Sequence, residues 1–384
     1  MSSPGTRTET AGQNGDNHLT LFLSGDVMTG RGIDQILPHP GDPTLHERAV
    51  SSAVEYVALA ERAGGPIPRH APFEYIWGDA LRELNHIEPH LRIVNLETAV
   101  TTSDDYWKGK GVHYRMHPAN APCLKAAAVD CCVLANNHML DWGYRGLEET
   151  LETLKAAAIT TVGAGANLER AEQPGRFELP GRGRVLVFGG GSVSSGIPYS
   201  WAARDKQCGI NLIDEASADS VSRIQVFVER SKRPGDLVVF SIHWGPNWGY
   251  EILPEQQRFA HELIELAGVD IIHGHSSHHV KGIEVYRGKP IIYGCGDFLT
   301  DYEGIKGYEE YRGDLGLMYF VSMDPATGNL SRLRMRPTRM RRFQVRRAAS
   351  ADAAWMAGVL SREGRKLGTR VDTDATDMLT LHWE

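Results

Sequence analysis

Ten polar side chains that can bind metal ions or transfer protons lie just after short apolar runs of the sequence. They are Asp26, Asn95, Glu97, Asn137, His138, Asp141, His243, His275, His278 and His279. Carboxylate and amide oxygens combine with neutral imidazole nitrogens in sites for one or two divalent cations. A single histidine or asparagine after a strand is commonly structural. Ten such residues after five apolar runs indicate one shared site.

The apolar runs that must position these residues alternate with helical patterns. Five runs are typical of buried strands: 19–23, 92–94, 132–134, 237–240 and 270–272. Apolar residues recur at helical spacing over 146–158 and 254–267. This alternation predicts an α/β fold, in which ligands bind outside the carboxyl ends of the strands. We therefore expect the polar side chains to meet at one edge of a sheet.

The composition narrows the class of protein. The 384-residue chain has 41 basic and 48 acidic side chains, hence a formal net charge of −7. This sign opposes binding to a phosphate backbone, so we expect no nucleic-acid partner. No apolar stretch reaches the length of a membrane span, and five cysteines without paired C-x-x-C elements argue against a disulfide framework. We expect a cytoplasmic protein without a membrane anchor; its oligomeric state stays open.

Three segments differ in composition. Residues 1–18 have too few apolar side chains to fold by burial, so we expect a disordered tail. Residues 19–325 carry the strand and helix patterns of one domain, and residues 326–384 are predicted to form a C-terminal extension that packs on it. The glycine runs at 163–166 and 189–192 lack the Lys-Ser/Thr ending of phosphate loops, so they predict tight strand-to-helix turns.

Four separated motifs carry most of the polar residues. They are Gly-Asp-Val-Met-x-Gly-Arg at 25–31, Asn-Leu-Glu-Thr at 95–98, Ala-Asn-Asn-His-x-x-Asp-x-Gly at 135–143 and Gly-His-Ser-Ser-His at 274–278. In type and order they resemble the CapA-like branch of the calcineurin-like metallophosphatases, from about residue 19 to about residue 320. The resemblance implies an α/β sandwich of two β-sheets flanked by helices, with a metal site at the strand carboxyl ends.

The resemblance also implies roles for individual residues. The implied metal ligands are Asp26, Glu97, Asn137, His243 and His275, with Glu97 in the place of a bridging carboxylate. His138 takes the place of the acid/base group. We expect two proton-transfer pairs, His138 with Asp141, and His278 or His275 with Asp297. The oxygen ligands favour Ca²⁺, Mg²⁺ or Mn²⁺, and the histidines keep Zn²⁺ open.

Two positions depart from the phosphatase pattern. Met28 stands where a metal-binding histidine is usual, and Ser277 stands where the last motif has its second histidine. Both departures weaken the second metal site, and hydrolysis in this fold relies on two cations about 3.5–4 Å apart. Acid/base chemistry around one cation is then favoured. The main hypothesis is a metal-dependent epimerase that converts an L residue to D in a ribosomal, lasso-type precursor peptide, as a soluble relative in this family does.

Two alternatives stay open. The same residues would serve a metal-dependent hydrolase of phosphoester, γ-glutamyl or other amide bonds. The chain could instead be a capsule or poly-γ-glutamate biosynthesis component without turnover, since the family is best known for that pathway.

Loops beside the motifs add aromatic and basic residues. Trp244 and Trp248 follow His243, and either core packing or stacking on a substrate group would explain them. The second motif is followed by Lys108, Lys110, His113 and Arg115, where a solvated charged loop is favoured over a site for a carboxylate such as a peptide C-terminus.

Overall fold

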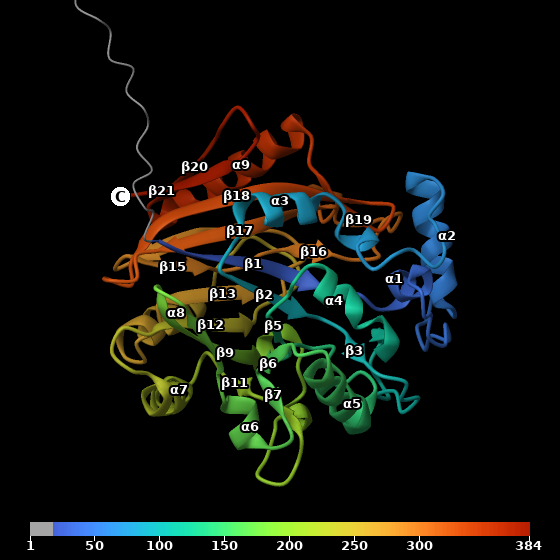
Figure 1. The fold of residues 1–384 in the computed structure, drawn as a ribbon, viewed down its shortest axis with the longest axis horizontal. Coiled ribbons are helices and arrows are strands. Elements are labelled where there is room, and N and C mark those ends of the chain that lie inside the picture. The colour runs from blue at the N-terminus through green and yellow to red at the C-terminus, as the bar shows by residue number, and fades with distance from the viewer. Residues whose placement is uncertain (1–17) are drawn as a thin grey trace, which may run out of the picture.

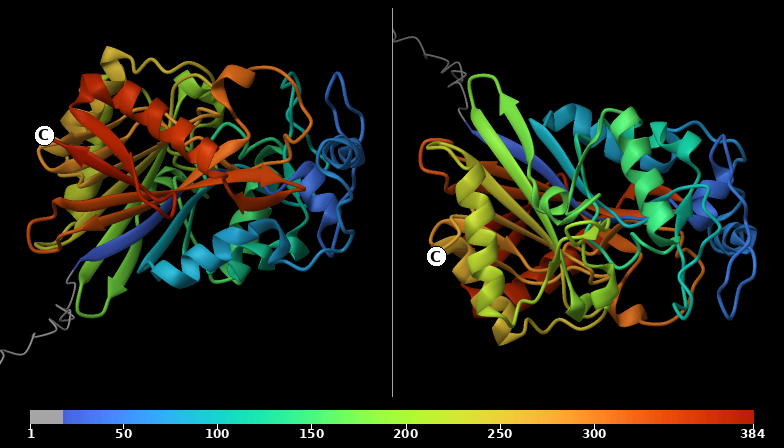
Figure 2. Two further views of the ribbon diagram at one scale, coloured as in Figure 1. Left: turned by 90° about the horizontal axis from the view of Figure 1, so that it is seen from above. Right: turned by 90° about the horizontal axis from the view of Figure 1, so that it is seen from below.

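The computed structural model describes residues 18–384, so the predicted tail at 1–18 lies, except for His18, outside the described residues. Two large β-sheets pack face to face, and helices cover their outer faces (Figure 1, Figure 2). The predicted α/β sandwich of two sheets flanked by helices is confirmed. Within 18–384, no helix has both the length and the apolar composition that a bilayer span requires.

The larger sheet has ten strands in the described part of the chain. Its main path runs in the order β20 (Thr369–Thr373), β21 (Leu379–Trp383), β18 (Leu330–Arg341), β17 (Leu315–Met323), β1 (Leu19–Val27), β2 (Leu91–Leu96), β5 (Cys131–Val133) and β6 (Thr160–Val162). β16 (Asp297–Leu299) pairs with β1, and β19 (Gln344–Arg347) pairs with β18. Because β1, β2, β5 and β6 are parallel, their carboxyl ends meet at one edge.

The smaller sheet has seven strands among the same residues. Its main path runs in the order β11 (Leu212–Ile213), β9 (Gly183–Ser192), β12 (Leu237–His243), β13 (Ile271–His275), β15 (Lys289–Ile292) and β14 (Ile283–Tyr286), and β8 (Gly175–Leu179) pairs with β9. β9, β12 and β13 are parallel, and their register sets His243 opposite His275. Two short pairs complete the strands: β3 (Ala99–Val100) with β4 (Arg115–Met116), and β7 (Ala164–Gly165) with β10 (Gly209–Ile210).

Helices connect most of these strands. The α-helices are α1 (Arg31–Ile36), α2 (Ala53–Gly64), α3 (Asp79–Ile87), α4 (Pro122–Ala126), α5 (Gly143–Ala156), α6 (Leu168–Glu172), α7 (Ala218–Ser231), α8 (Pro254–Glu265) and α9 (Ser350–Gly364). Short 3-10 helices lie at Tyr75–Trp77, Pro118–Asn120, Val193–Ser195, Tyr199–Trp201, Glu309–Tyr311 and Arg365–Leu367. The predicted helices over 146–158 and 254–267 correspond to α5 and α8.

Three hydrophobic clusters hold the layers together. Between the sheets, Leu21 and Leu23 of β1 share a cluster with Val187 and Val239 of the smaller sheet. Phe22 belongs to a second cluster with residues of α2 to α5, because successive strand residues face opposite sides. The third cluster lies between the smaller sheet and helices α7 and α8. Burial of each large apolar side chain contributes roughly 1.5–3 kcal/mol.

The segment after residue 325 is integrated into this fold. It supplies β18, β19, β20 and β21 to the larger sheet, and α9 contacts β20 of that sheet and β14 of the smaller one. The division into a domain at 19–325 and an extension at 326–384 stays a prediction.

The expectation of a turn at 189–192 is wrong. These residues end β9, in register with β12. A Cβ atom added to Gly189 would lie only 2.9 Å from the Gly163 Cα atom, and one added to Gly191 would lie 2.7 Å from the Ala135 carbonyl oxygen. The glycines therefore allow backbone of the larger sheet to approach the smaller sheet closely.

Candidate metal centre

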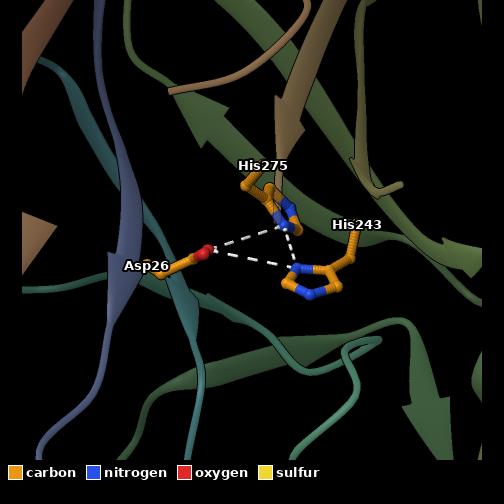
Figure 3. A group of neighbouring side chains, drawn as sticks. All are labelled: Asp26, His243 and His275. Carbon is orange, nitrogen blue, oxygen red and sulfur yellow. Dashed lines mark hydrogen bonds and ion pairs between the residues drawn. The ribbon is translucent and has the colours of Figure 1, made fainter. Parts of the chain in front are cut away.

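The carboxyl ends of parallel strands from both sheets converge on one buried point. Asp26 lies near the end of β1, and His243 and His275 end β12 and β13. In Figure 3 the Asp26 carboxylate faces the two imidazoles. Its Oδ1 atom lies 4.0 Å from His243 Nδ1 and 3.9 Å from His275 Nδ1, and the two nitrogens are 2.8 Å apart.

Neighbouring hydrogen bonds fix the tautomer of His275. Burial lowers the pKa of His273 to about 4 and that of His275 well below its ordinary value, so both rings are neutral. His273 Nε2 donates to the Ser24 carbonyl oxygen (2.8 Å), and its Nδ1 therefore accepts the Ser241 hydroxyl proton (2.9 Å). The Ser241 oxygen in turn accepts the His275 Nε2–H (2.9 Å). The His275 Nδ1 lone pair is left to face Asp26, as a metal ligand requires.

His243 has ligand-type neighbours at both ring nitrogens. Its Nδ1 faces Asp26 and His275, and its Nε2 lies 3.1 Å from Asn137 Oδ1 and 3.8 Å from Glu97 Oε1. Burial lowers the pKa of His243 well below its ordinary value, so the ring is neutral. Nε2–H donates to the Asn137 oxygen, which leaves the Nδ1 lone pair for a cation. Direct ligation by Asn137 stays a prediction.

The carboxylates at this point are buried and incompletely bonded. Asp26 Oδ2, Glu97 Oε2 and Asp297 Oδ2 have no hydrogen-bond partner within residues 18–384. Burial, and then the charge of Asp297, raise the pKa of Asp26 to about 7, against the opposing effect of the Asn95 amide that donates to Oδ1 (2.7 Å). Burial, then the Asp26 charge, raises the pKa of Glu97 well above its ordinary value. Unpaired buried carboxylates are costly, so this donor set fits a divalent cation.

The first predicted proton-transfer pair lies beside Glu97. His138 Nδ1 donates to Asp141 Oδ2 (2.7 Å), and the Tyr114 main-chain N–H donates to the same oxygen (2.7 Å). The Tyr114 ring stacks on the imidazole at 3.8 Å. Burial, then the Lys110 charge, lowers the pKa of His138 well below its ordinary value, so the ring is neutral. Its Nε2 atom lies 3.9 Å from Glu97 Oε1 and can accept a proton there.

Lys110 joins this pair, so the expectation of a solvated loop is wrong for this residue. Its ammonium group donates to the Asn137 carbonyl oxygen (2.5 Å) and to Asp141 Oδ1, and it lies 3.0 Å from His138 Nδ1. Only 21% of its side chain is exposed. The short β3–β4 pairing folds the intervening loop back onto residues 137–141, a tertiary contact that charge patterning does not reveal.

The second predicted pair lies against Asp26. His278 Nδ1 is 3.0 Å from Asp297 Oδ1, and Asp297 is the register partner of Asp26. Burial lowers the pKa of His278, but the charge of Asp297, the hydrogen bond to Asp297 and the charge of Asp26 together outweigh burial, so the pKa is raised. His279 lies outside the group, although it follows the same strand: its Nε2 accepts the Gly249 main-chain N–H and its ring packs on Trp248.

An amide chain supports Asp26 from the larger sheet. Asn136 Nδ2 donates to Asn95 Oδ1 (3.1 Å), and Asn95 Nδ2 donates to Asp26 Oδ1. Asn136 escaped the sequence analysis, although its place beside Asn137 in the third motif could have marked it. The structure thus brings all nine predicted site residues into one connected cluster, through Asp26 on one side and Glu97 on the other.

Comparison with known proteins gives a consistent set of relatives. The family described as "Bacterial capsule synthesis protein PGA_cap" matches residues 20–302. A Mycobacterium tuberculosis protein, named a probable polyglutamine synthesis accessory protein, is 47% identical over 364 residues, which cover 94% of this chain and 96% of the relative. The capsule biosynthesis protein CapA of Bacillus anthracis is 28% identical over 292 residues, which cover 74% of this chain and 60% of CapA.

Among solved structures, the chain is similar to one described as a novel phosphatase of Mycoplasma pneumoniae, with a TM-score of 0.46 and 11% identity. The match covers 83% of this chain and 93% of that chain.

Proposed function

The chain belongs to the bacterial capsule synthesis protein PGA_cap family, and from this membership we propose that it is a metal-dependent hydrolase of amide bonds in a glutamyl or glutaminyl polymer. We choose a glutamyl or glutaminyl amide as the bond to be cleaved because the relatives are named for polyglutamine and capsule synthesis. This proposal is one form of the hydrolase alternative that the sequence analysis left open.

One observation carries the metal dependence. Asp26, His243 and His275 offer three ligand atoms within 4.8 Å of one another in a buried place, and the spare Asp26 oxygen has no partner within residues 18–384. The tautomer of His275 is set by its neighbours so that a lone pair faces this place. The Nδ1 lone pairs of His243 and His275 face each other, an arrangement that is unfavourable without a cation between them.

The chain's own residues then divide the chemistry. A divalent cation bound at this place would act as a Lewis acid on the oxygen of the bond to be cleaved. His138 Nε2 accepts a proton from water and returns it to the leaving nitrogen. Asp141 holds the imidazole in the tautomer that this requires, and Lys110 holds Asp141. Glu97 lies between His138 and His243 and couples the pair to the cation site.

Cα epimerisation of a peptide, the main hypothesis from the sequence, becomes the second candidate. Two His–Asp pairs border the cluster, as an exchange of a Cα proton needs. The relatives described above are named for the synthesis of a polymer and not for a change of configuration, so epimerisation ranks second.

The test uses the purified chain with Mn²⁺, Mg²⁺, Ca²⁺ or Zn²⁺ in D₂O. The substrates are poly-γ-glutamate, a polyglutamine peptide, an aryl phosphate and a peptide ending in an aromatic residue. Mass spectrometry and chiral amino-acid analysis follow the products. We expect metal-dependent cleavage of a glutamyl or glutaminyl amide, lost in Asp26→Asn and His243→Ala and kept in His382→Ala, which removes a partly exposed imidazole on β21.

Other outcomes overturn the proposal in different ways. A deuterium atom at Cα of a D residue, without cleavage, would establish the epimerase. Turnover of the aryl phosphate alone would replace the amide by a phosphoester. Retained amide cleavage in Asp26→Asn would move the chemistry away from this cluster.

A further inference from the structure

Two tyrosine hydroxyls meet beside the two His–Asp pairs, outside the set of candidate metal ligands. The hydroxyl oxygens of Tyr114 and Tyr302 are 2.5 Å apart and share one hydrogen bond. The Tyr114 ring stacks on His138 with the ring centroids 3.8 Å apart, and the Tyr302 ring meets His278 edge-on at 5.6 Å. The joined phenols therefore connect the histidine of one pair to the histidine of the other.

The hydroxyl pair carries one proton more than its hydrogen bond uses. Burial raises the pKa of both phenols well above the ordinary value, so Tyr114 and Tyr302 are neutral and each keeps its proton. One proton lies in the shared hydrogen bond, and the other has no acceptor within residues 18–384. The spare oxygens of Glu97 and Asp297 do not take it, because they have no partner among the same residues. One O–H group is therefore available to a molecule that enters the site, and leaving it unpaired is costly.

The charges that act on the phenols place this O–H group close to the candidate centre. After burial and the neighbouring phenol, the charges of Asp297 and Glu97 raise the pKa of Tyr302. After burial, the charge of Glu97 also raises the pKa of Tyr114. Effects of this kind act over short distances. Glu97 is the carboxylate that lies 3.9 Å from His138 Nε2, the atom assigned to proton transfer.

Arg31, the last residue of the first motif, holds the tyrosine pair in place. Its guanidinium donates to both carboxylate oxygens of Asp301, the residue before Tyr302, at 3.1 and 2.5 Å. The same guanidinium lies 4.7 Å from the centroid of the Tyr114 ring. Arg31 is only 4% exposed and has a φ of 45°, a strained value for a residue with a Cβ atom. One buried side chain thus fixes the positions of both phenols.

We propose that Tyr302 is a further catalytic residue, whose hydroxyl donates a hydrogen bond to the substrate oxygen that gains negative charge as the amide is attacked. Tyr302 is assigned to the substrate because part of it is exposed, whereas Tyr114 is 4% exposed. Tyr114 then donates to the Tyr302 oxygen, and a chain of hydroxyls strengthens each hydrogen bond in it. No proton is transferred by the tyrosines. The inference rests on the proposed function for the identity of the substrate oxygen.

Phenylalanine variants test this role because they remove only the oxygen. Tyr302→Phe keeps the ring beside His278. We expect kcat of the Mn²⁺-loaded full chain on a glutamyl or glutaminyl peptide to fall about 100- to 1,000-fold with KM nearly unchanged, since such a donor acts in the transition state. Tyr114→Phe keeps the stack on His138 and removes only the donor to Tyr302, so we expect a loss in kcat of up to about tenfold.

Tyr56→Phe is the matched control. The Tyr56 ring also packs on Arg31, 3.9 Å from the guanidinium carbon, but its hydroxyl donates to Glu47. This variant should keep the kcat of the wild type. Bound Mn²⁺, circular dichroism and the thermal midpoint of each variant separate a lost donor from a lost metal or a lost fold.

Two kinetic results would overturn the inference. One is a folded, Mn²⁺-loaded Tyr302→Phe chain with the kcat of the wild type, or with a change confined to KM. If Tyr302→Phe does not fold, the other is an unchanged kcat in Tyr114→Phe.

Binding of inorganic phosphate separates this inference from the proposed function. Phosphate presents tetrahedral, negatively charged oxygens without any cleavage, and calorimetric titration into the Mn²⁺-loaded chain measures its Kd. We expect binding about 10- to 100-fold weaker in Tyr302→Phe and unchanged in Tyr56→Phe. A wild-type chain that cleaves no glutamyl or glutaminyl amide but shows this difference keeps the role of Tyr302 and overturns the proposed hydrolase. Cleavage that is as fast in Tyr302→Phe as in the wild type does the reverse.

Discussion

His273 Nε2 donates to the Ser24 carbonyl oxygen at 2.8 Å, and this contact joins the two sheets next to the candidate metal centre. Ser24 and Asp26 both belong to β1, and His273 and His275 both belong to β13. The contact therefore does more than pack two layers. Through Ser241 it decides which nitrogen of His275 bears the proton.

Removing the link should weaken metal binding. In Ser241→Ala the His275 Nε2–H loses its acceptor, so the ring is free to turn or to change tautomer. Loss of such an outer hydrogen bond typically lowers metal affinity about 10- to 100-fold. Calorimetric titration with Mn²⁺ measures the change. Ser322→Ala is the control, since Ser322 is also a buried strand serine but bonds Thr20 at the other end of β1; equal affinity losses in both variants would contradict the tautomer role.

Lys110→Met should lower turnover without changing the metal content. The methionine keeps the length of the side chain but removes the donor to Asp141 and to the Asn137 carbonyl oxygen. A hydrogen bond to a charged group contributes about 1.5–3 kcal/mol, so we expect kcat to fall about 10- to 100-fold. Lys110→Arg should recover part of the loss. A kcat equal to that of the wild type would show that the His138–Asp141 pair needs no ammonium group.

The metal-free protein should lose stability as the pH rises from about 7 to about 8. The unfolded Asp26 carboxyl, near its ordinary pKa of 3.8, holds no proton there, whereas the folded one, with a pKa of about 7, still holds part of one. Folding takes up protons, so the free energy of unfolding falls with rising pH; for this group the slope is about 0.7 kcal/mol per pH unit at pH 7, where the folded carboxyl is half protonated, and it declines towards zero near pH 8. Below pH 7 the histidines, with lowered pKa values, oppose this trend.

Urea unfolding in EDTA at several pH values measures this slope. Asp26→Asn should flatten it, because the amide does not titrate, and saturating Mn²⁺ should flatten it in the wild type. An unchanged slope in Asp26→Asn would show that the carboxyl titrates as it does in the unfolded chain.

The convergence of Asp26, His243 and His275 could be predicted from the sequence. Each residue comes at the end of an apolar run, and the carboxyl ends of parallel strands share an edge. The position of Asp297 beside Asp26 was harder to predict. β16 is far from β1 in the sequence, and no local sequence pattern indicates that the two strands pair. Lys110 was missed for a similar reason: its partners come from another loop, so a local charge pattern looked like a solvated surface.

At the glycine run 189–192, a local sequence pattern predicted a turn that the structure does not have. Consecutive glycines locally favour a turn, but here they serve close packing between backbones, which only the tertiary structure reveals.

Gly189→Ala should therefore be strongly destabilising. The added methyl group would overlap backbone of Gly163, and overpacking of this kind costs about 1–3 kcal/mol. Gly358→Ala is the matched control in α9, where a Cβ atom meets nothing within 4 Å and the helix gains up to about 1 kcal/mol. Chemical unfolding of both variants measures the difference; equal effects would contradict close packing at Gly189.

The most direct test of a metal-dependent hydrolase is the origin of the oxygen in the product. The Mn²⁺-loaded chain is incubated with a defined glutamyl or glutaminyl peptide in H₂¹⁸O, and the fragments are weighed by mass spectrometry. We predict one ¹⁸O atom in the newly formed carboxylate, with no product in EDTA or in Asp26→Asn. Product that forms in EDTA, or cleavage without ¹⁸O in the new carboxylate, would contradict metal-dependent hydrolysis at Asp26.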